Sequence, residues 1–147
     1  MAIINYNVVG TGSTTTVLST ELNSLATATD SGAGTAYDNT PSSSSLGFTN
    51  AIAEFNGTFG TNPTASTAAY LYILPSLDGT NYGDANSTAG QIAAVFPLRA
   101  TTSAQRVERV IDLPPCKVKF LLRTDAGQTL ASSGNTVIIR PFNYASN

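Results

Sequence analysis

The densest group of side chains that could do chemistry lies in the stretch DGTNYGDAN, residues 78–86. It offers the oxygen ligands that Ca²⁺ prefers, from Asp78, Thr80, Asn81, Asp84 and Asn86. Their spacing does not follow the EF-hand pattern, and the same residue types are common turn formers. We interpret the stretch first as a turn-making loop after the apolar segment YLYIL, with an ion site as the alternative.

Tyr82 is the aromatic residue of this polar loop. In such a place a tyrosine either folds back onto its own domain or anchors a partner. Tyr70 and Tyr72 lie in the middle of an expected strand, where burial is the better interpretation. Trp is absent, so the flat aromatic platform of many carbohydrate-binding sandwiches is not evident.

Catalytic chemistry finds little support in the residue types. The chain has no His, which removes the commonest general base and every Ser-His or Cys-His nucleophile pair. Lys117 and Lys119 alternate with apolar residues beside Arg123, so neither is expected to be buried as a base. We predict that the protein is not an enzyme and uses no cofactor, metal or small-molecule substrate.

Charge is scarce and unevenly distributed. Charged residues make up 11% of the chain, against 41% hydrophobic residues, and a surface of hydroxyls and amides is typical of proteins that meet other proteins. Residues 1–98 hold six acidic residues and no Lys or Arg, whereas residues 99–147 hold seven basic and three acidic ones. Either the two parts neutralise each other within the fold, or copies associate with acidic surfaces facing basic ones. The net charge of −2 indicates no nucleic-acid partner.

Cys116 is the single cysteine, which excludes an internal disulfide, and we expect it to be a small buried hydrophobe. The N-terminus has no basic region followed by a long apolar run, so no signal peptide is expected. No stretch approaches transmembrane length. We therefore expect synthesis in a cytoplasm and no membrane partner.

Period-2 hydrophobic patterns dominate the sequence. In residues 117–124, Val118, Phe120 and Leu122 point one way and the basic residues the other, which predicts a half-buried strand. Residues 91–98, with residues 92, 94, 96 and 98 on one face, and residues 106–113 and 135–142 also predict strands. Residues 46–59 and 68–74 have apolar residues on both faces, which is typical of strands covered on both sides. Turn residues separate these segments. Such strands predict an all-β fold, an antiparallel, jelly-roll-like β-sandwich.

The first 45 residues differ from the rest. Residues 3–9 can form a strand, and STELNSLATA can form a helix of about two turns with Leu22 and Leu25 on one face. Residues 30–47 are rich in Gly, Ser and Thr and lack periodicity. They form either a surface loop or an arm that orders against a neighbouring subunit. We divide the chain into an N-terminal arm, 1–45, with at most one short helix, and a sandwich body, 46–147.

Three segments in the same order resemble small structural proteins of tailed bacteriophages. They are TELNSL (residues 20–25), YLYILPSLDGTNYGD (70–84) and IDLPPCKVKFLLRTDAGQTLASSGNTVIIRPFNY (111–144). Together they span most of the chain. None is a catalytic motif.

The resemblance implies a head decoration, or cement, protein that binds the outer surface of the capsid. Its partners would be the major capsid protein and further copies of itself, with a trimer favoured. The alternative is a tail, head-fibre or baseplate component that binds the host surface, and a third hypothesis is a carbohydrate- or calcium-binding β-sandwich module. Residues predicted to form the subunit or capsid interface are Ile4, Tyr6, Tyr37, Asp78, Asn81, Tyr82, Lys117, Lys119 and Arg123.

Overall fold

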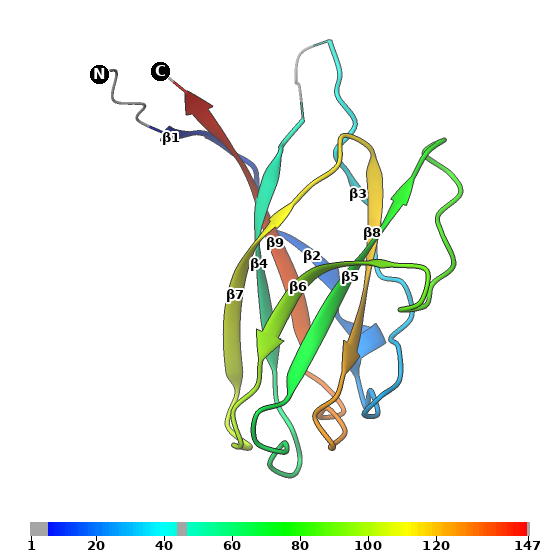
Figure 1. Ribbon diagram of the computed structural model, residues 1–147, viewed down its shortest axis with the longest axis vertical. Coiled ribbons are helices and arrows are strands. Elements are labelled where there is room, and N and C mark those ends of the chain that lie inside the picture. The colour runs from blue at the N-terminus through cyan, green and yellow to red at the C-terminus, as the bar shows by residue number, and fades with distance from the viewer. Residues whose placement is uncertain (1–5, 44–46, 147) are drawn as a thin grey trace.

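The computed structural model describes residues 6–43 and 47–146, which form two stacked antiparallel β-sheets (Figure 1). Sheet A has the order β1-β9-β4-β7, and β2 also pairs with β9. Its strands are β1 (Tyr6–Thr11), β2 (Thr15–Leu18), β4 (Asn50–Gly57), β7 (Gln105–Asp112) and β9 (Thr136–Ser146). Sheet B has the order β3-β8-β5-β6, from β3 (Tyr37–Asp38), β8 (Lys117–Thr124), β5 (Ala68–Ser76) and β6 (Gln91–Pro97).

The path of the chain between the sheets is that of a jelly roll. From β2 to β9, every connection passes from one sheet to the other, except that between β5 and β6, which are neighbours in sheet B. The result is two four-stranded layers, β2-β9-β4-β7 and β3-β8-β5-β6, which is the jelly-roll arrangement. The predicted all-β, jelly-roll-like sandwich is confirmed.

The core lies between the sheets and is built from alternate residues of each strand. On β8, Val118, Phe120 and Leu122 are fully buried, as their spacing predicts. Phe55 of β4 stacks on Phe96 of β6 with ring centroids 5.7 Å apart, which joins the two layers near the sandwich centre. Burying such side chains supplies roughly 1.5–3 kcal/mol each.

The pattern of β6 differs from the expected one because the strand contains a β-bulge. Residues 92, 94, 96 and 98 were expected on one face. The pairing shifts between Leu71 and Tyr72, so that Leu71 faces Ala94 and Tyr72 faces Ile92. Ala93 is therefore the extra residue, and Ile92 points outward with 52% of its surface exposed.

The expected two-turn helix is a single 3₁₀ turn, Thr20–Leu22. No side chain of Ser19 caps it; instead the Glu21 carboxylate accepts the Ser19 backbone N–H at 2.9 Å. The helical path ends at Asn23, whose backbone is extended with a ψ of 124°, and Ser24 follows with a positive φ of 56°. Leu22 and Leu25 are nevertheless both buried in the main core.

Residues 28–39 lie along the free edge of β8. The backbone N–H groups of Ala28, Ser31 and Gly34 donate to the carbonyls of alternate β8 residues, Thr124, Leu122 and Phe120. The Ser31 hydroxyl accepts the Leu122 N–H at 2.8 Å, and β3 continues the same edge opposite Val118 and Lys117. Within the described residues this part of the predicted arm packs on its own sandwich, as the surface-loop alternative requires. The division of the chain at residue 45 stays a prediction.

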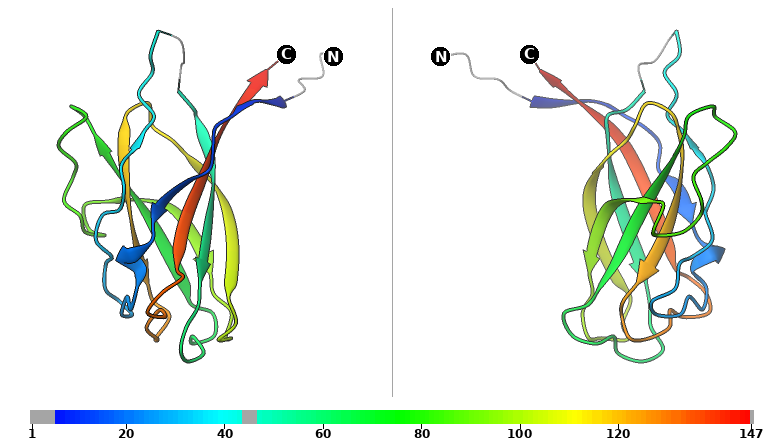
Figure 2. Two further views of the ribbon diagram at one scale, coloured as in Figure 1. Left: turned by 180° about the vertical axis from the view of Figure 1, so that it is seen from behind. Right: turned by 45° about the vertical axis from the view of Figure 1, so that its right-hand side comes forward.

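At one end of the sandwich, β1 and the end of β9 form a two-stranded ribbon that projects from the body (Figure 2). Tyr6 pairs with Ser146 and Thr11 with Phe142. The first residue of β4, Asn50, pairs with Phe142, so β9 runs past β4 from that point. The expected strand at residues 3–9 is thus found as β1, except for the part before Tyr6, including Ile4, which lies outside the described residues.

We predict that Gly34→Ala destabilises the isolated chain, because a Cβ at Gly34 would lie 1.9 Å from the Val17 carbonyl oxygen. Relief requires a backbone shift, which we expect to cost about 1–3 kcal/mol in the free energy of unfolding. Urea denaturation measures this loss. The matched control is Gly32→Ala, whose Cβ would meet only the Glu21 side chain at 3.8 Å. Equal stabilities for the two variants would show that residues 28–39 are not packed on the sandwich in solution.

Candidate functional site

The structure brings five of the predicted interface residues together at one end of sheet B. The loop that follows β5 carries Asp78, Asn81 and Tyr82, and the neighbouring strand β8 presents Lys117 and Lys119. The other predicted residues lie elsewhere. Tyr37 packs against the main core, Arg123 lies further along β8, and Tyr6 lies in the β1–β9 ribbon. The predicted residues therefore do not form one surface, and their role in an interface stays a prediction.

The Asp78 carboxylate organises its own loop. Oδ1 accepts the backbone N–H groups of Thr80 at 2.8 Å and Asn81 at 2.7 Å, and Oδ2 accepts the Asn81 side-chain amide at 2.6 Å. These hydrogen bonds hold the pKa of Asp78 far below its ordinary value of 3.8. The loop oxygens with the best chemistry for Ca²⁺ are thus already used in turn formation. Among the described residues, no three His, Cys, Asp or Glu side chains are grouped as metal ligands.

Tyr82 folds back onto its own sandwich. The Lys119 ammonium lies 4.8 Å from the centre of the Tyr82 ring, a cation–π contact. The side chain is half-buried. Of the two roles open to this tyrosine, the structure shows the intramolecular one.

The uneven charge distribution is partly neutralised within the fold. Salt bridges join the acidic residues of the first part to basic residues of the last third at three places: Glu54–Arg106 at 2.6 Å, Asp38–Lys117 at 3.7 Å and Asp30–Arg123 at 3.5 Å. These contacts favour neutralisation within the fold over association of acidic with basic surfaces. Each pair is solvent-exposed to some degree, so each contributes little to stability.

Sheet B is covered by the chain itself over the outer face of β5 and part of that of β8. Tyr72, Leu74 and Leu121 form a small buried cluster there, against which Ala33 packs. The loop between β5 and β6 closes over the same side, since Gly90 lies against the Tyr72 and Leu74 side chains. The Ser87 N–H donates to the Asp30 carboxylate at 2.7 Å, which ties this loop to residues 28–39. Both faces of β5 are therefore largely buried, as its apolar residues on both sides require. On the outer face of β8, Leu121 is buried, whereas the basic residues Lys117, Lys119 and Arg123 stay partly exposed.

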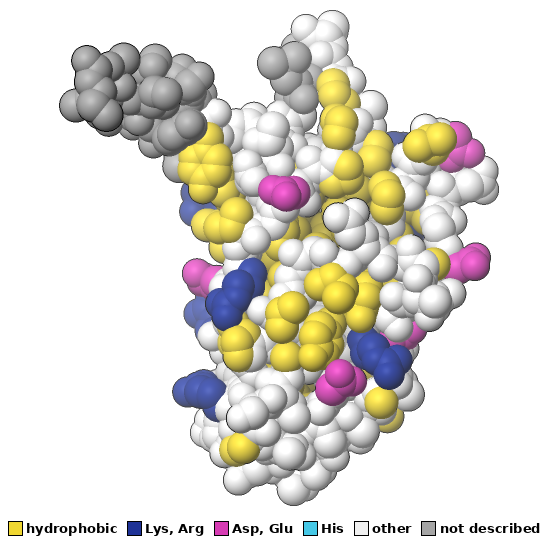
Figure 3. Space-filling view, in the orientation of Figure 1, with side chains coloured by type: hydrophobic (Ala, Val, Ile, Leu, Met, Phe, Trp, Pro, Cys, Tyr) yellow, Lys and Arg dark blue, Asp and Glu magenta, His cyan; other side chains and the backbone are white. Residues whose placement is uncertain are grey.

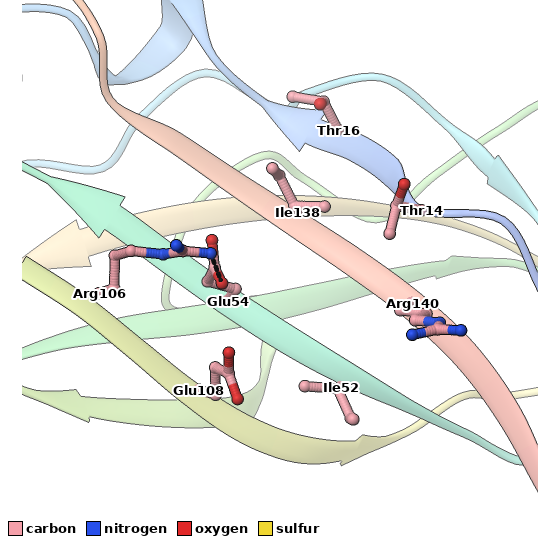
Figure 4. Close-up of a pocket in the computed structure, with 8 residues that line it drawn as sticks. All are labelled: Thr14, Thr16, Ile52, Glu54, Arg106, Glu108, Ile138 and Arg140. Atoms are coloured by element: carbon pink, nitrogen blue, oxygen red, sulfur yellow. Dashed lines mark hydrogen bonds and ion pairs between the residues drawn. The ribbon is translucent and has the colours of Figure 1, made fainter.

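Sheet A has an outer face that the described residues leave open, and this face is the candidate functional site. Outward-pointing residues of β4, β7 and β9 surround a hollow of about 420 Å³ (Figure 4). Ile52 and Ile138 form its apolar part. Its charged part consists of two glutamates and two arginines. The lining residues are Thr14, Thr16, Ile52, Glu54, Arg106, Glu108, Ile138 and Arg140.

A second, more apolar hollow of about 240 Å³ continues the first toward the ribbon. The two share Ile52 and Arg140. Val110, 57% exposed, and Tyr144, 50% exposed, line it. The Tyr144 ring meets the Phe142 ring edge-on at 4.9 Å between centroids. The whole open face thus combines exposed apolar side chains with a balanced set of charges, a composition typical of protein-contact surfaces.

The opposite side of the molecule carries a smaller apolar area. Figure 3 shows hydrophobic side chains gathered over β6 and the gap beside β7. Ile92 and Val95 of β6 are 52% and 41% exposed. A hollow of about 280 Å³ at its end is lined by Ile92, Ala93 and Pro114, among others. Asp112 also lines this hollow, but none of the salt bridges of the described residues lies in it.

Sequence patterns did not single out the open face. Ile52, Val110 and Ile138 lie in strands that have apolar residues at both odd and even positions. The alternation therefore does not say which side of the strand is open. One signal was available in the sequence. The charged residues Glu54, Glu108 and Arg140 each lie two positions from one of these apolar residues, and therefore on the same side of its strand.

Comparisons with known proteins give no family assignment. No protein-family profile matches the sequence, and no curated protein matches it. Three similar solved structures share 9–12% identity with the chain.

The first is the C-terminal CBM6 of LamC, a marine laminarinase from Zobellia galactanivorans, with 9% identity over 91% of this chain and 92% of that one, and a TM-score of 0.47. Xyl-CBM35, in complex with a glucuronic acid-containing disaccharide, has 12% identity, coverage of 99% and 86%, and a TM-score of 0.45. The C-terminal domain of EclA, a sugar-binding protein, has 10% identity, coverage of 91% and 79%, and a TM-score of 0.37. Likenesses at this level do not bear on what the present chain binds.

None of the helical turns within the described residues has the length and apolar character needed to cross a membrane.

We predict that Asp78→Ala loosens the loop at residues 78–81, because the variant loses the acceptor for the Thr80 and Asn81 N–H groups. Hydrogen exchange of these two amides should accelerate, with the β5 and β8 amides unchanged. Asp84→Ala is the matched control in the same loop. Because the folded-state pKa of Asp78 is lowered, the contribution of its carboxylate is complete above about pH 4 and declines as the pH falls toward the lowered value. Unchanged exchange in Asp78→Ala would contradict the assigned role.

Proposed function

We propose that the chain is a structural protein of a tailed-bacteriophage virion that decorates the outside of the head and stabilises it through protein–protein contacts. Its partners in this proposal are the major capsid protein and further copies of itself. The open face of sheet A is the observation that carries the proposal. The covered sheet B and the intramolecular role of the Asp78 loop leave sheet A as the broad contact surface.

The residue pattern supports the assignment to a virion. Of the three segments that resemble tailed-phage structural proteins, the first contains the 3₁₀ turn, and the other two contain most of β5 and β9 and all of β8. The jelly roll is a common architecture of capsid proteins and also of lectins, so the fold alone does not choose a function.

Stabilisation of a head would follow from the number of contacts rather than from any one of them. A stable contact buries on the order of 1,000 Å² or more, which requires a broad surface such as one sheet face. Because many identical copies bind one shell, weak individual contacts add up through avidity. The projecting β1–β9 ribbon offers a further contact element, since the backbone groups on the free edges of a sheet can pair with another chain.

We expect the purified protein to co-sediment with heads that lack it and to raise the temperature at which those heads disassemble. Val110→Asp, which places a charge on the open face, should weaken head binding at least about tenfold. Leu77→Asp is the control, because Leu77 is an exposed apolar residue that lies at the end of β5, away from the open face.

Heads that are equally stable with and without the protein would contradict the proposal. Immunogold labelling of virions gives an independent check, since labelling confined to the tail or baseplate would favour the alternative of a host-binding component.

A sugar-binding module is the second candidate, and the charged hollow of sheet A favours it. Arg140, Glu108 and the Thr16 hydroxyl offer donors and acceptors around an apolar floor, a set that suits a polyhydroxylated ligand. If the hollow binds sugar, calorimetry with neutral and acidic glycans gives a saturable heat that Arg140→Ala abolishes and Arg109→Ala leaves intact. For a decoration protein we expect no such heat at millimolar glycan.

A further inference from the structure

We propose that the outer face of sheet A binds a second copy of the chain through a two-fold axis, with Glu108 of each copy paired to Arg140 of the other. This inference rests on the proposed function, which makes the open face a protein-contact surface. The inference names a second copy of the chain as the partner of that face. It is tested on the isolated protein, so it can fail independently.

The charges of the open face point to a self-complementary contact. The face carries two arginines and two glutamates around its hollow. Arg106 and Glu54 satisfy each other within the chain, with Nη2 and Oε2 2.6 Å apart. Glu108 and Arg140 form no salt bridge with any described residue. Glu108 interacts with Arg106 through its charge, but the ion pair of Arg106 is with Glu54. Glu108 and Arg140 are therefore the acidic and the basic side chain of this face that can form a salt bridge across an interface.

The register of sheet A fixes where these two residues lie. On β4, Glu54 pairs with Glu108 of β7, and Ile52 pairs with Arg140 of β9. Glu108 and Arg140 thus flank β4 on opposite sides, one outward-facing step apart along the strand (Figure 4). Any two-fold axis that exchanges them passes over the midpoint between Glu54 and Ile52. Two copies related in this way form two Glu108–Arg140 pairs.

Apolar side chains lie at the centre of the same arrangement. Ile52 and Val110 face each other in the register of β4 and β7, and they are 38% and 57% exposed. With the axis over β4, the Ile52 and Val110 side chains of the two copies lie near the axis. The Glu54 carboxylates lie equally near it, each neutralised by Arg106 of its own chain. An interface with apolar side chains near its centre and charged pairs beside them has the organisation of a specific contact.

A second copy explains the charges better than a different protein does. In a two-fold contact the same patch occurs on both partners, so its acidic and basic groups must complement each other. A different partner imposes no such relation between Glu108 and Arg140. The outer face of sheet B offers no comparable surface over β5 and β8, because the Ser87–Asp30 and Tyr82–Lys119 contacts hold the chain's own loops there. Among the described residues, its exposed Ile92 and Val95 on β6 carry no charged pair beside them.

The symmetry of this contact has a consequence for assembly. A face that packs on itself about a two-fold axis generates a dimer, not a ring of three. The trimer that the family resemblance implies would therefore use another surface, and the sheet A contact would join trimers or act alone.

Charge reversal tests the pair directly. We expect sedimentation equilibrium of the wild-type chain, 15.2 kDa, to show a dimer of twice that mass. Glu108→Arg and Arg140→Glu should each raise the dimer Kd at least about tenfold, because each turns two attractive pairs into repulsive ones. The double variant, Glu108→Arg with Arg140→Glu, should restore the Kd to within about threefold of wild type.

Two controls carry the same charge changes at exposed positions away from the face. They are Arg99→Glu, in the loop after β6, and Asp84→Arg, in the loop after β5. Both should leave the Kd unchanged, and thermal unfolding should show that every variant remains folded.

Cross-linking gives a second measurement that does not depend on charge. In a Cys116→Ser background, Ile52→Cys lies close to the proposed axis, and a short bis-maleimide should join two copies efficiently. Leu77→Cys in the same background should not cross-link above the level of random collision.

A wild-type chain that stays monomeric, or a double reversal as defective as the single ones, would overturn the inference. If such a chain still binds heads, only the two-fold contact fails and the proposed function stands. If the double reversal restores the dimer but the wild-type protein does not bind heads, the two-fold contact stands and the proposed function fails. A third outcome is that no dimer forms and that the single and double reversals all weaken head binding equally. The open face would then contact the shell protein and not a second copy.

Discussion

The covering of β8 is the constraint on which the rest of the structure depends. This strand has apolar residues on both sides, with Phe120 and Leu122 toward the core and Leu121 outward, all fully buried. A strand of this kind is stable only if something covers its second face and its free edge. Residues 28–39 donate backbone hydrogen bonds to alternate β8 carbonyls, and the loop after β5 covers the outer face of β5. The centre of sheet B is therefore buried on both sides, whereas β6 keeps Ile92 and Val95 exposed.

The two sheets consequently have different roles. Sheet B is closed by its own chain, and the residues of its lid are committed to contacts such as Asp78 with its loop amides and Tyr82 with Lys119. Sheet A keeps one face toward the surroundings, where Ile52 and Val110 stand among arginine and glutamate side chains. An exposed apolar area with balanced charge has the character of a contact surface, which is why we propose that this face contacts other protein.

Buried amide side chains hold the crossings between the sheets together. Asn39 bonds Phe48 and Pro114 through its side chain, Gln105 bonds both backbone groups of Arg99, and Asn135 bonds Thr58 and Ala131. Each satisfies backbone groups at a point where the chain changes layer, so that few buried polar groups are left unpaired. Nothing in the spacing of these residues distinguishes them from the many other amides of the sequence.

The sequence by itself determined the all-β class, the inward residues of β8, the two-sided burial of β5 and the absence of histidine chemistry, because period-2 patterns and residue types are local properties. It could not decide whether residues 28–39 form an arm or an edge, because their hydrogen bonds to β8 decide this. Nor could it decide whether Tyr82 turns inward, which depends on Lys119 of a neighbouring strand. The direction of Ile92 depends on a bulge opposite Tyr72. Tertiary structure alone selected sheet A as the open face. Strands with apolar residues on both sides look alike in sequence, and only the path of the chain determines which of them it covers.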